Sequence, residues 1–130
     1  MSRTIFLTGV LFGVLAVILG AFGAHGLEKV LDRDALETFE TGVRYQMYHA
    51  FLLLILGQTT RIPEQRKKWT FYAIALGIVL FSFSIYFLAT NAQTTFDFRV
   101  FGPVTPIGGL LLILGWIALG YQVYKSFEEK

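Results

Sequence analysis

Residues 4–24 form an uncharged apolar run, which constrains the fold of this chain more than any other stretch. About 20 residues rising 1.5 Å each match a bilayer hydrocarbon core of about 30 Å, so a helix over this run is long enough to span a membrane. Further uncharged windows follow over 45–60, 69–96 and 100–124, and every acidic or basic residue lies outside these four runs. Such segregation is typical of membrane spans and loops, whereas a soluble helical protein mixes charges into each helix.

Composition supports this interpretation and excludes several classes of function. The 130 residues are 55% hydrophobic and only 15% charged. The absence of cysteine excludes disulfides, thiol catalysis and cysteine-ligated metals. The net charge of +2 is too small to indicate nucleic acid binding. The first apolar run exceeds the roughly 7–15 residues of a signal peptide's apolar region, so we expect it to be retained as a span.

The four apolar runs predict an all-α membrane protein, built as an antiparallel four-transmembrane-helix bundle. We expect a single integral membrane domain over residues 1–130. The predicted spans are about 4–24, 43–60, 69–90 and 107–124.

An amphipathic interfacial helix is predicted between the first two spans. Asp34 is the expected N-cap, with Glu37 at the reciprocal capping-box position. Leu36, Phe39 and Val43 then recur at helical spacing on one face. Because no proline separates this segment from the second span, we expect that it can continue directly into it.

Proline and glycine cluster at the start of the fourth span. Proline is tolerated in the first helical turn because the first N–H groups have no helical partner. A broken or re-entrant element over 101–109 is the alternative that we consider less fitting. The residues concerned are Pro103, Pro106, Gly108 and Gly109.

The distribution of basic residues predicts the orientation in the membrane. If the turn at 61–68 is cytoplasmic, seven Lys and Arg residues lie on that side and four on the other. By the positive-inside rule, both termini of this multi-pass protein then face the cytoplasm, as expected for a bacterial inner-membrane protein. The seven are Arg3, Arg61, Arg66, Lys67, Lys68, Lys125 and Lys130.

Small residues recur along one face of the first span, at steps of four, three, four and three. That spacing forms a strip where another helix backbone can approach closely. We therefore predict a helix-packing face and, as the first functional hypothesis, a non-enzymatic bundle that self-associates as a homo-oligomer. The strip consists of Gly9, Gly13, Ala16, Gly20 and Gly23.

The two histidines and their polar neighbours form a candidate binding or structural polar cluster. His25 ends the first span and His49 lies early in the second, so the predicted topology puts both at the outer leaflet. Spacings of i, i+4 put Glu40 with Arg44, and Tyr45 with His49, on shared helix faces. The cluster comprises His25, Glu40, Arg44, Tyr45, Tyr48 and His49.

Three interpretations of this cluster compete. In the first, which we favour, His25 interacts with the last carbonyls of span one, Gly26 provides a left-handed cap, and His49 bonds a neighbouring helix. In the second, the imidazoles bind a metal or haem, although two histidines without cysteine are a weak signal. In the third, the cluster is a proton-sensitive or polar substrate site.

Several motifs resemble those of a known family of small bacterial inner-membrane proteins, the domain-of-unknown-function family 423. The resemblance covers nearly the whole chain in order, and it implies a multi-pass inner-membrane protein with no established activity. The motifs are Gly20-Ala21-Phe22-Gly23-Ala24-His25-Gly26-Leu27, Thr41-Gly42-Val43-Arg44-Tyr45-Gln46-Met47-Tyr48-His49-Ala50, Thr105-Pro106-Ile107-Gly108-Gly109 and Gly115-Trp116.

The functional expectations are correspondingly limited. We find no glycine-rich phosphate loop and no Ser/His/Asp set in the sequence, so we predict no enzyme, no catalytic residue, no metal and no cofactor. The expected partners are the lipid bilayer and a second copy of the chain, and no nucleic acid. The alternative function is binding or transport of a small or lipidic molecule at an outer-leaflet site around His25 and His49.

Overall fold

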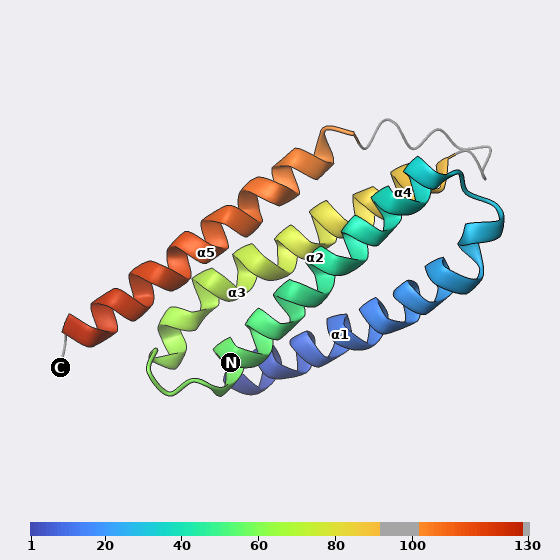
Figure 1. Ribbon diagram of the computed structural model, residues 1–130. Helices are drawn as coiled ribbons and strands as arrows, with labels where there is room; N and C mark the ends of the chain where they lie inside the picture. Colours follow the sequence, from blue (N-terminus) through green and yellow to red (C-terminus); the bar gives the residue numbers. More distant parts are fainter. Residues whose placement is uncertain (92–101, 129–130) are drawn as a thin grey trace.

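The structure is a computed structural model that describes residues 1–91 and 102–128. Within these ranges it contains helices and short connections and no strand, and the helices form long rods (Figure 1). The predicted loop residue Arg99 and tail residue Lys130 lie outside the described residues. The helices are α1 (Ser2–His25), the 3-10 helix η1 (Leu27–Lys29), α2 (Arg33–Gln58), α3 (Glu64–Ile78), the π-helix η2 (Val79–Phe83), α4 (Ser84–Ala89) and α5 (Val104–Glu128).

Three helical segments of the described chain are long and apolar enough to cross a membrane. They are Ser2–Lys29, Glu64–Ala89 and Val104–Glu128. The second of these is the continuous rod formed by α3, η2 and α4. The prediction of an all-helical membrane protein is thus confirmed at this level. α2 is as long as the others, but its charged first turns and its polar residues Gln46 and His49 make it less apolar.

α1 and α2 pack along each other in opposite directions, and the predicted small-residue strip lies between them. A Cβ atom built on Gly9 would lie 3.0 Å from the Ala50 carbonyl oxygen, and one on Gly23 would lie 3.1 Å from the Phe39 ring. Ala16 is buried, and Gly20 faces Val43. The strip therefore packs against α2 of the same chain. Gly13 differs, because no atom lies within 4 Å of a Cβ placed there.

Two predicted helix caps, one at the start of α2 and one at the end of α1, are wrong. α2 is capped by Asp32, whose carboxylate accepts from the Ala35 N–H at 2.7 Å, and Asp34 lies inside the first turn. Gly26 has φ −107° and ψ −55°, which is not left-handed. Its N–H bonds the Phe22 carbonyl at 2.7 Å, and the chain continues into η1. A left-handed cap is unnecessary because the chain does not reverse at Gly26.

The segments predicted as the interfacial helix and as the second span form one uninterrupted helix, as the lack of proline indicated. α2 runs from Arg33 to Gln58 without a break. Its predicted apolar face is turned inward at Phe39, which packs with Tyr86 at a ring separation of 5.0 Å. Glu37 and Glu40 are exposed on the opposite side.

α5 packs against the α3–η2–α4 rod through three glycines. A Cβ on Gly77 would lie 2.7 Å from Leu112, one on Gly115 would overlap the end of the Ile74 side chain, and one on Gly108 would overlap the Phe81 backbone nitrogen. The ribbon of α5 therefore passes directly over the π-helix.

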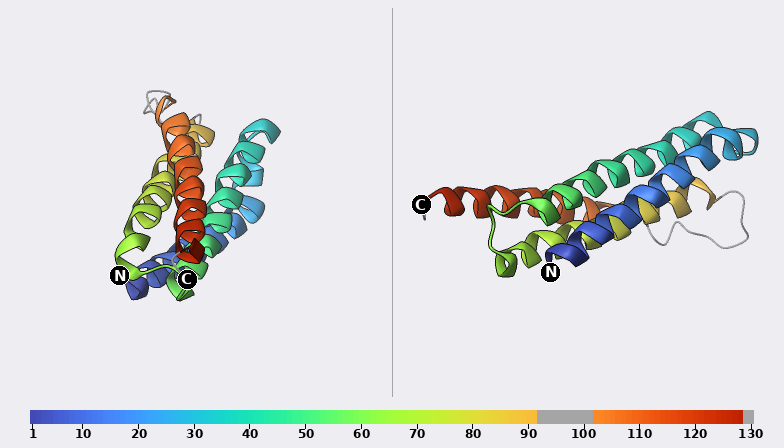
Figure 2. Two further views of the ribbon diagram at one scale, coloured as in Figure 1. Left: turned by 90° about the vertical axis from the view of Figure 1, so that its left-hand side faces the viewer. Right: turned by 90° about the horizontal axis from the view of Figure 1, so that it is seen from below.

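Both described ends of the chain lie at the same end of the molecule (Figures 1 and 2). The Ser2 N–H donates to Glu64 at 3.0 Å, and the Ser126 hydroxyl donates to the Arg61 carbonyl at 2.6 Å. The first turn of α1 is thus tied to the first residue of α3, and the last turn of α5 is tied to the turn before α3.

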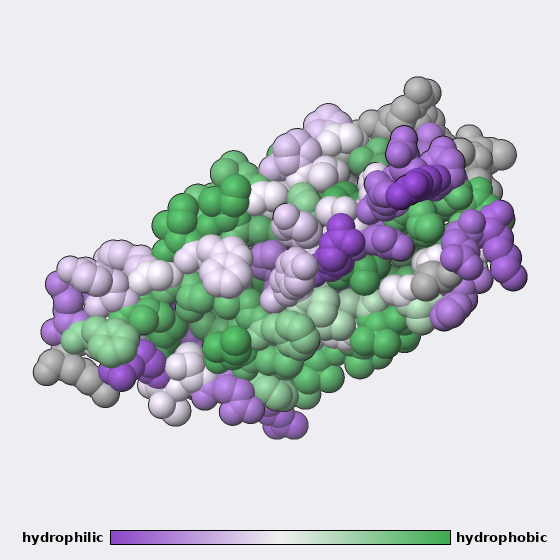
Figure 3. All heavy atoms as spheres, in the orientation of Figure 1, coloured by the Kyte–Doolittle hydropathy of each residue, from purple (hydrophilic) through white to green (hydrophobic). Residues whose placement is uncertain are grey.

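The surface is apolar where a soluble protein would be polar. Figure 3 shows hydrophobic residues over much of the middle of one face and hydrophilic residues mainly toward the two ends. Large apolar side chains such as Leu11, Val17 and Ile55 are exposed, whereas Gln46 and Ser82 are fully buried. This arrangement suits a surface that contacts lipid.

Candidate functional site

Aromatic residues of α2, η2 and α5 enclose a cleft of about 360 Å³ in the side of the molecule. We call it the aromatic cleft. It opens to the surroundings, since Tyr45 is 41% exposed and Trp116 is 50% exposed. None of the described residues that line it carries a formal charge. The lining consists of Tyr45, His49, Phe81, Gly109, Leu112, Ile113 and Trp116.

His49 is the buried polar centre of this cleft, with 5% of its surface exposed. Its Nδ1 lies 2.7 Å from the Tyr45 carbonyl oxygen, one turn earlier in α2. The indole N–H of Trp116 donates to its Nε2 at 3.0 Å. Both ring nitrogens are therefore engaged, and the second bond joins α2 to α5.

The helices position these side chains through simple spacings. Tyr45 and His49 are four residues apart on α2 and stack at 6.3 Å. Phe81 comes from η2, where the wider π turn presents its ring 5.1 Å from that of Tyr45. The close approach of Gly108 brings α5 near enough for Trp116 to reach His49, and the next residue, Gly109, leaves the cleft open.

A second set of buried polar groups lies next to His49, toward α1. The Gln46 amide donates to the Phe12 carbonyl at 2.8 Å and accepts from the Tyr86 hydroxyl at 2.6 Å. The Ser82 hydroxyl donates to the Gly42 carbonyl at 2.9 Å. Since these groups satisfy one another, they hold α1, α2 and the α3–η2–α4 rod in register.

The structure separates the predicted polar cluster into two regions. Tyr45 and His49 line the aromatic cleft, and Tyr48 stands beside them with its ring 5.9 Å from that of Tyr45. His25 is exposed at the end of α1. Because Gly9 packs beside Ala50, the residue after His49, and His25 lies sixteen residues beyond Gly9, the two histidines are about 24 Å apart along the bundle.

The charged members of the predicted cluster do not reach the cleft. Arg44 donates to the Thr41 hydroxyl at 3.1 Å, on the outside of α2. Glu40 is exposed one turn earlier on the same helix. Within residues 1–91 and 102–128, no three His, Cys, Asp or Glu side chains gather in a way that could hold a metal.

The predicted start of the fourth span proves to be a first helical turn that touches both the π-helix and the cleft. Pro103 precedes α5 and Pro106 lies in its first turn, both exposed. Gly108 and Gly109 follow, against Phe81. His49 and this turn, which are far apart in the sequence, therefore meet at the aromatic cleft.

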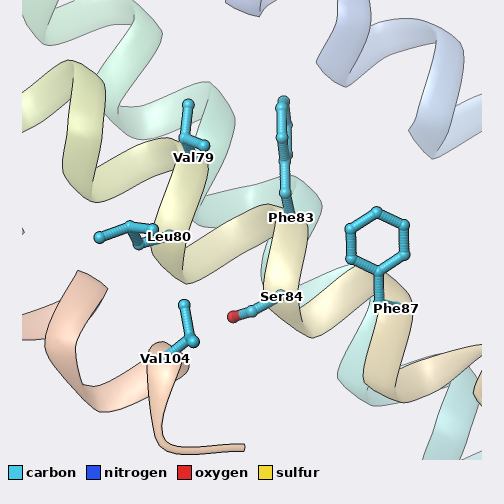
Figure 4. A pocket seen from close by; sticks show the side chains of 6 residues that line it. All are labelled: Val79, Leu80, Phe83, Ser84, Phe87 and Val104. Atoms are coloured by element: carbon cyan, nitrogen blue, oxygen red, sulfur yellow. The ribbon is translucent and has the colours of Figure 1, made fainter. Parts of the chain in front are cut away.

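A smaller apolar cavity of about 280 Å³ lies beside the same π-helix (Figure 4). Figure 4 shows Ser84 pointing from the α3–η2–α4 rod toward Val104 at the start of α5, whereas Phe83 and Phe87 point away from Val104. The Ser84 hydroxyl is 2.5 Å from the Thr105 hydroxyl and also donates to the Phe81 carbonyl. This cavity therefore lacks a free polar group from Ser84.

Comparison with known proteins establishes the family. The family described as "Protein of unknown function (DUF423)" matches residues 19–109 of this chain. The chain belongs to the DUF423 family. This confirms the resemblance inferred from the sequence motifs. His49 of this DUF423 protein lies inside the matched range and Trp116 lies beyond it.

Relatives of the DUF423 protein are membrane proteins of similar length. A UPF0382 membrane protein of Staphylococcus haemolyticus is 40% identical over 117 residues, covering 90% of this chain and 92% of the relative. One from Staphylococcus epidermidis is 39% identical over 123 residues, covering 95% and 97%. One from Haemophilus influenzae is 38% identical over 116 residues, covering 89% and 90%. No solved structure matches the chain.

Proposed function

We propose that this DUF423 protein is a non-enzymatic, multi-pass protein of the bacterial inner membrane that binds a membrane-soluble amphiphile in the aromatic cleft. The observation that carries the proposal is a buried histidine and a half-exposed tryptophan, hydrogen-bonded to each other in a lipid-accessible cleft. A polar ionisable residue inside a transmembrane helix is costly, and such residues commonly mark sites for substrates or ions.

The proposed topology has four crossings, with both termini in the cytoplasm. α2 lies beside α1 from Phe39, next to Gly23, to Gly57, next to Phe6. A bilayer that contains α1 must therefore contain this part of α2. The two ends of the chain share the end of the molecule that carries the basic turn at 61–68, which supports a cytoplasmic location for both.

This topology puts the aromatic cleft at about half the depth of the bilayer rather than at its outer leaflet. His49 lies nine residues before the end of α2 at Gln58, or about 14 Å along the helix. The hydrocarbon core is about 30 Å thick. A ligand at this depth reaches the cleft by lateral diffusion within the membrane.

Binding fits the geometry of His49 better than catalysis does. A general base needs a nitrogen that can accept a proton from the substrate. In this protein the Nε2 of His49 already accepts from Trp116, and its Nδ1 faces the Tyr45 carbonyl. The same bonds argue against His49 as a haem or metal ligand, since Trp116 occupies the coordinating nitrogen.

Self-association stays a prediction. Its proposed surface, the strip from Gly9 to Gly23, is largely covered by α2 within one chain. Only the groove around Gly13, lined with apolar residues of α1 and α2, leaves part of it open. An oligomer built through α1 would have to use this groove.

Native mass spectrometry of protein extracted with its surrounding lipid tests the binding proposal. We expect a bound molecule of defined mass on the wild-type protein. Gly109→Phe should remove it, because a side chain there grows into the cleft while its Cβ makes only ordinary contact with Phe81, at 3.5 Å. Gly120→Phe is the matched control on α5, where no atom lies within 4 Å of a Cβ.

Two results would overturn the proposal. One is a wild-type protein that carries no bound molecule. The other is equal retention of the molecule by Gly109→Phe and Gly120→Phe, provided that both variants keep the helical circular dichroism of the wild type.

A further inference from the structure

We infer that the ligand of the aromatic cleft is an uncharged planar ring that bears carbonyl or hydroxyl oxygens and an apolar tail, as in the isoprenoid quinones. This inference rests on the proposed function and specifies the chemical class of the ligand. It depends on the ring surfaces, the charge, the polar atoms and the size of the cleft.

Aromatic side chains form much of the lining of the cleft. Tyr45 and Phe81 are tilted at 5.1 Å, and the Trp116 ring meets His49 edge-on at 6.0 Å and 73°. The half-exposed Trp116 on α5 and Tyr45 on α2 thus line the cleft from different helices. Aromatic rings attract one another beyond simple burial, which favours a flat conjugated ligand over a flexible chain.

The absence of charge among the described lining residues selects a neutral ligand. Arg44, the nearest cation in sequence to Tyr45, bonds Thr41 on the outside of α2. A charged headgroup at half the bilayer depth would be buried without a partner, which is strongly unfavourable. Phospholipid headgroups, which remain at the interface, are excluded by the same reasoning.

The polar atoms of the cleft match ring oxygens. The Tyr45 hydroxyl has no hydrogen-bond partner in the described part of the chain, and it can donate to a carbonyl. The same hydroxyl can instead accept from a ligand hydroxyl, so the Trp116–His49 bond stays intact in either case. A quinone carbonyl and a quinol hydroxyl each find a counterpart here.

The volume of about 360 Å³ suits a single substituted ring. It lies at the small end of the roughly 300–1,000 Å³ range of ligand pockets. An apolar tail has a path outward along Ile113, which is 58% exposed on α5. The ring would therefore be held by protein and the tail by lipid.

The two tryptophans permit a site-resolved test by fluorescence quenching. Trp69→Phe leaves Trp116 as the only tryptophan, in the cleft, and Trp116→Phe leaves only Trp69, which is exposed near the start of α3. Each variant in nanodiscs is titrated with a short-tailed ubiquinone and, separately, with a brominated alkyl alcohol, a quencher without a ring. We expect saturable quinone quenching of Trp116 and only linear collisional quenching of Trp69.

A matched pair of variants in the Trp69→Phe background tests the location. Ile113→Phe fills the mouth of the cleft and should raise the half-saturating quinone concentration about tenfold. Ile117→Phe, one turn further along α5 and similarly exposed, lies outside the lining and should leave it unchanged.

The outcomes separate this inference from the proposed function. If the alcohol saturates as tightly as the quinone, or saturates when the quinone does not, the ring class is wrong and the binding site stands. If neither probe shows saturable quenching of Trp116, both proposals fail. Equal effects of Ile113→Phe and Ile117→Phe would place the quinone elsewhere and overturn the inference.

Discussion

A tryptophan indole can donate a hydrogen bond but cannot accept one, and this property defines the state of His49. The Trp116 Nε1 lies 3.0 Å from the His49 Nε2, so that nitrogen is the acceptor and carries no proton. The Nδ1, at 2.7 Å from the Tyr45 carbonyl oxygen, must then carry the ring's single proton. The ring is therefore neutral and fixed in one tautomer, as suits a histidine in a low-dielectric environment.

Nitrogen NMR of protein labelled at histidine tests this assignment. We expect one neutral histidine with a protonated Nδ1 and an unprotonated Nε2, together with the separate signal of exposed His25. Trp116→Phe removes the donor and should let the His49 signal shift or broaden between tautomers, while His25→Ala identifies its own signal. A protonated Nε2 in the wild-type protein would contradict the Trp116–His49 bond.

Sequence reasoning identified the local half of this site and could not identify the remote half. Tyr45 and His49 were paired because residues four apart share a helix face. Trp116 is separated from His49 by 67 residues, and its position depends on how α5 packs against the α3–η2–α4 rod. Gln46 and Tyr86 were missed as well, although a glutamine three residues before His49 in an apolar span was a signal that it needed a buried partner.

The π-helix is the element on which the packing of α5 depends. It interrupts the rod at Val79–Phe83, and π turns inside α-helices frequently occur at functional sites. Gly108 sits directly on the backbone of Phe81, and the aromatic cleft begins one residue later at Gly109. The irregular turn and the glycine thus set the width of the cleft together.

The change in stability caused by replacing a glycine of α5 with alanine should depend on which atoms the new Cβ contacts. At Gly108 it overlaps the Phe81 backbone, which cannot rotate away, so we expect Gly108→Ala to lower the free energy of unfolding by about 1–3 kcal/mol. Gly115→Ala meets the flexible end of Ile74 and should cost less. Gly120→Ala meets nothing and should gain up to about 1 kcal/mol of helix propensity.

Unfolding in a graded detergent series, followed by circular dichroism, measures this ranking. Gly120→Ala serves as the control for replacing a glycine in α5. If Gly108→Ala and Gly120→Ala changed the unfolding midpoint equally, the close approach of α5 to the π-helix would be wrong.

Hydropathy was enough to predict most of the helices but not their irregularities. The first span was predicted at 4–24 and is observed at Ser2–His25, because the apolar run and the helix coincide. The π turn was not predicted, since Val79–Phe83 is as apolar as its neighbours. The N-cap was misplaced because Asp32 and Asp34 are equally good caps by residue type, and only the backbone at Asp32 is extended.

At the scale of the whole molecule, apolar surface and buried polar groups are explained together by lipid. Exposed residues such as Phe51, Ile113 and Ile117 would favour aggregation in water. The bonds of Gln46, His49 and Ser82 are sheltered between helices, where they compensate for the lack of water. In the proposed topology, the two polar ends of the bundle face the two aqueous compartments.

Cysteine labelling can determine which end faces which compartment, because the native chain has no cysteine. Asp34→Cys reports the exposed start of α2, and Glu64→Cys and Glu128→Cys report the opposite end of the bundle. If the basic turn is cytoplasmic, a membrane-impermeant maleimide should label Asp34→Cys in intact spheroplasts and label the other two only after lysis. The reverse pattern would invert the topology, and labelling of Asp34→Cys and Glu64→Cys from the same side would show that α2 and α1 do not cross together. In that case His49 would not lie at half depth, and a ligand could not reach the aromatic cleft from within the bilayer.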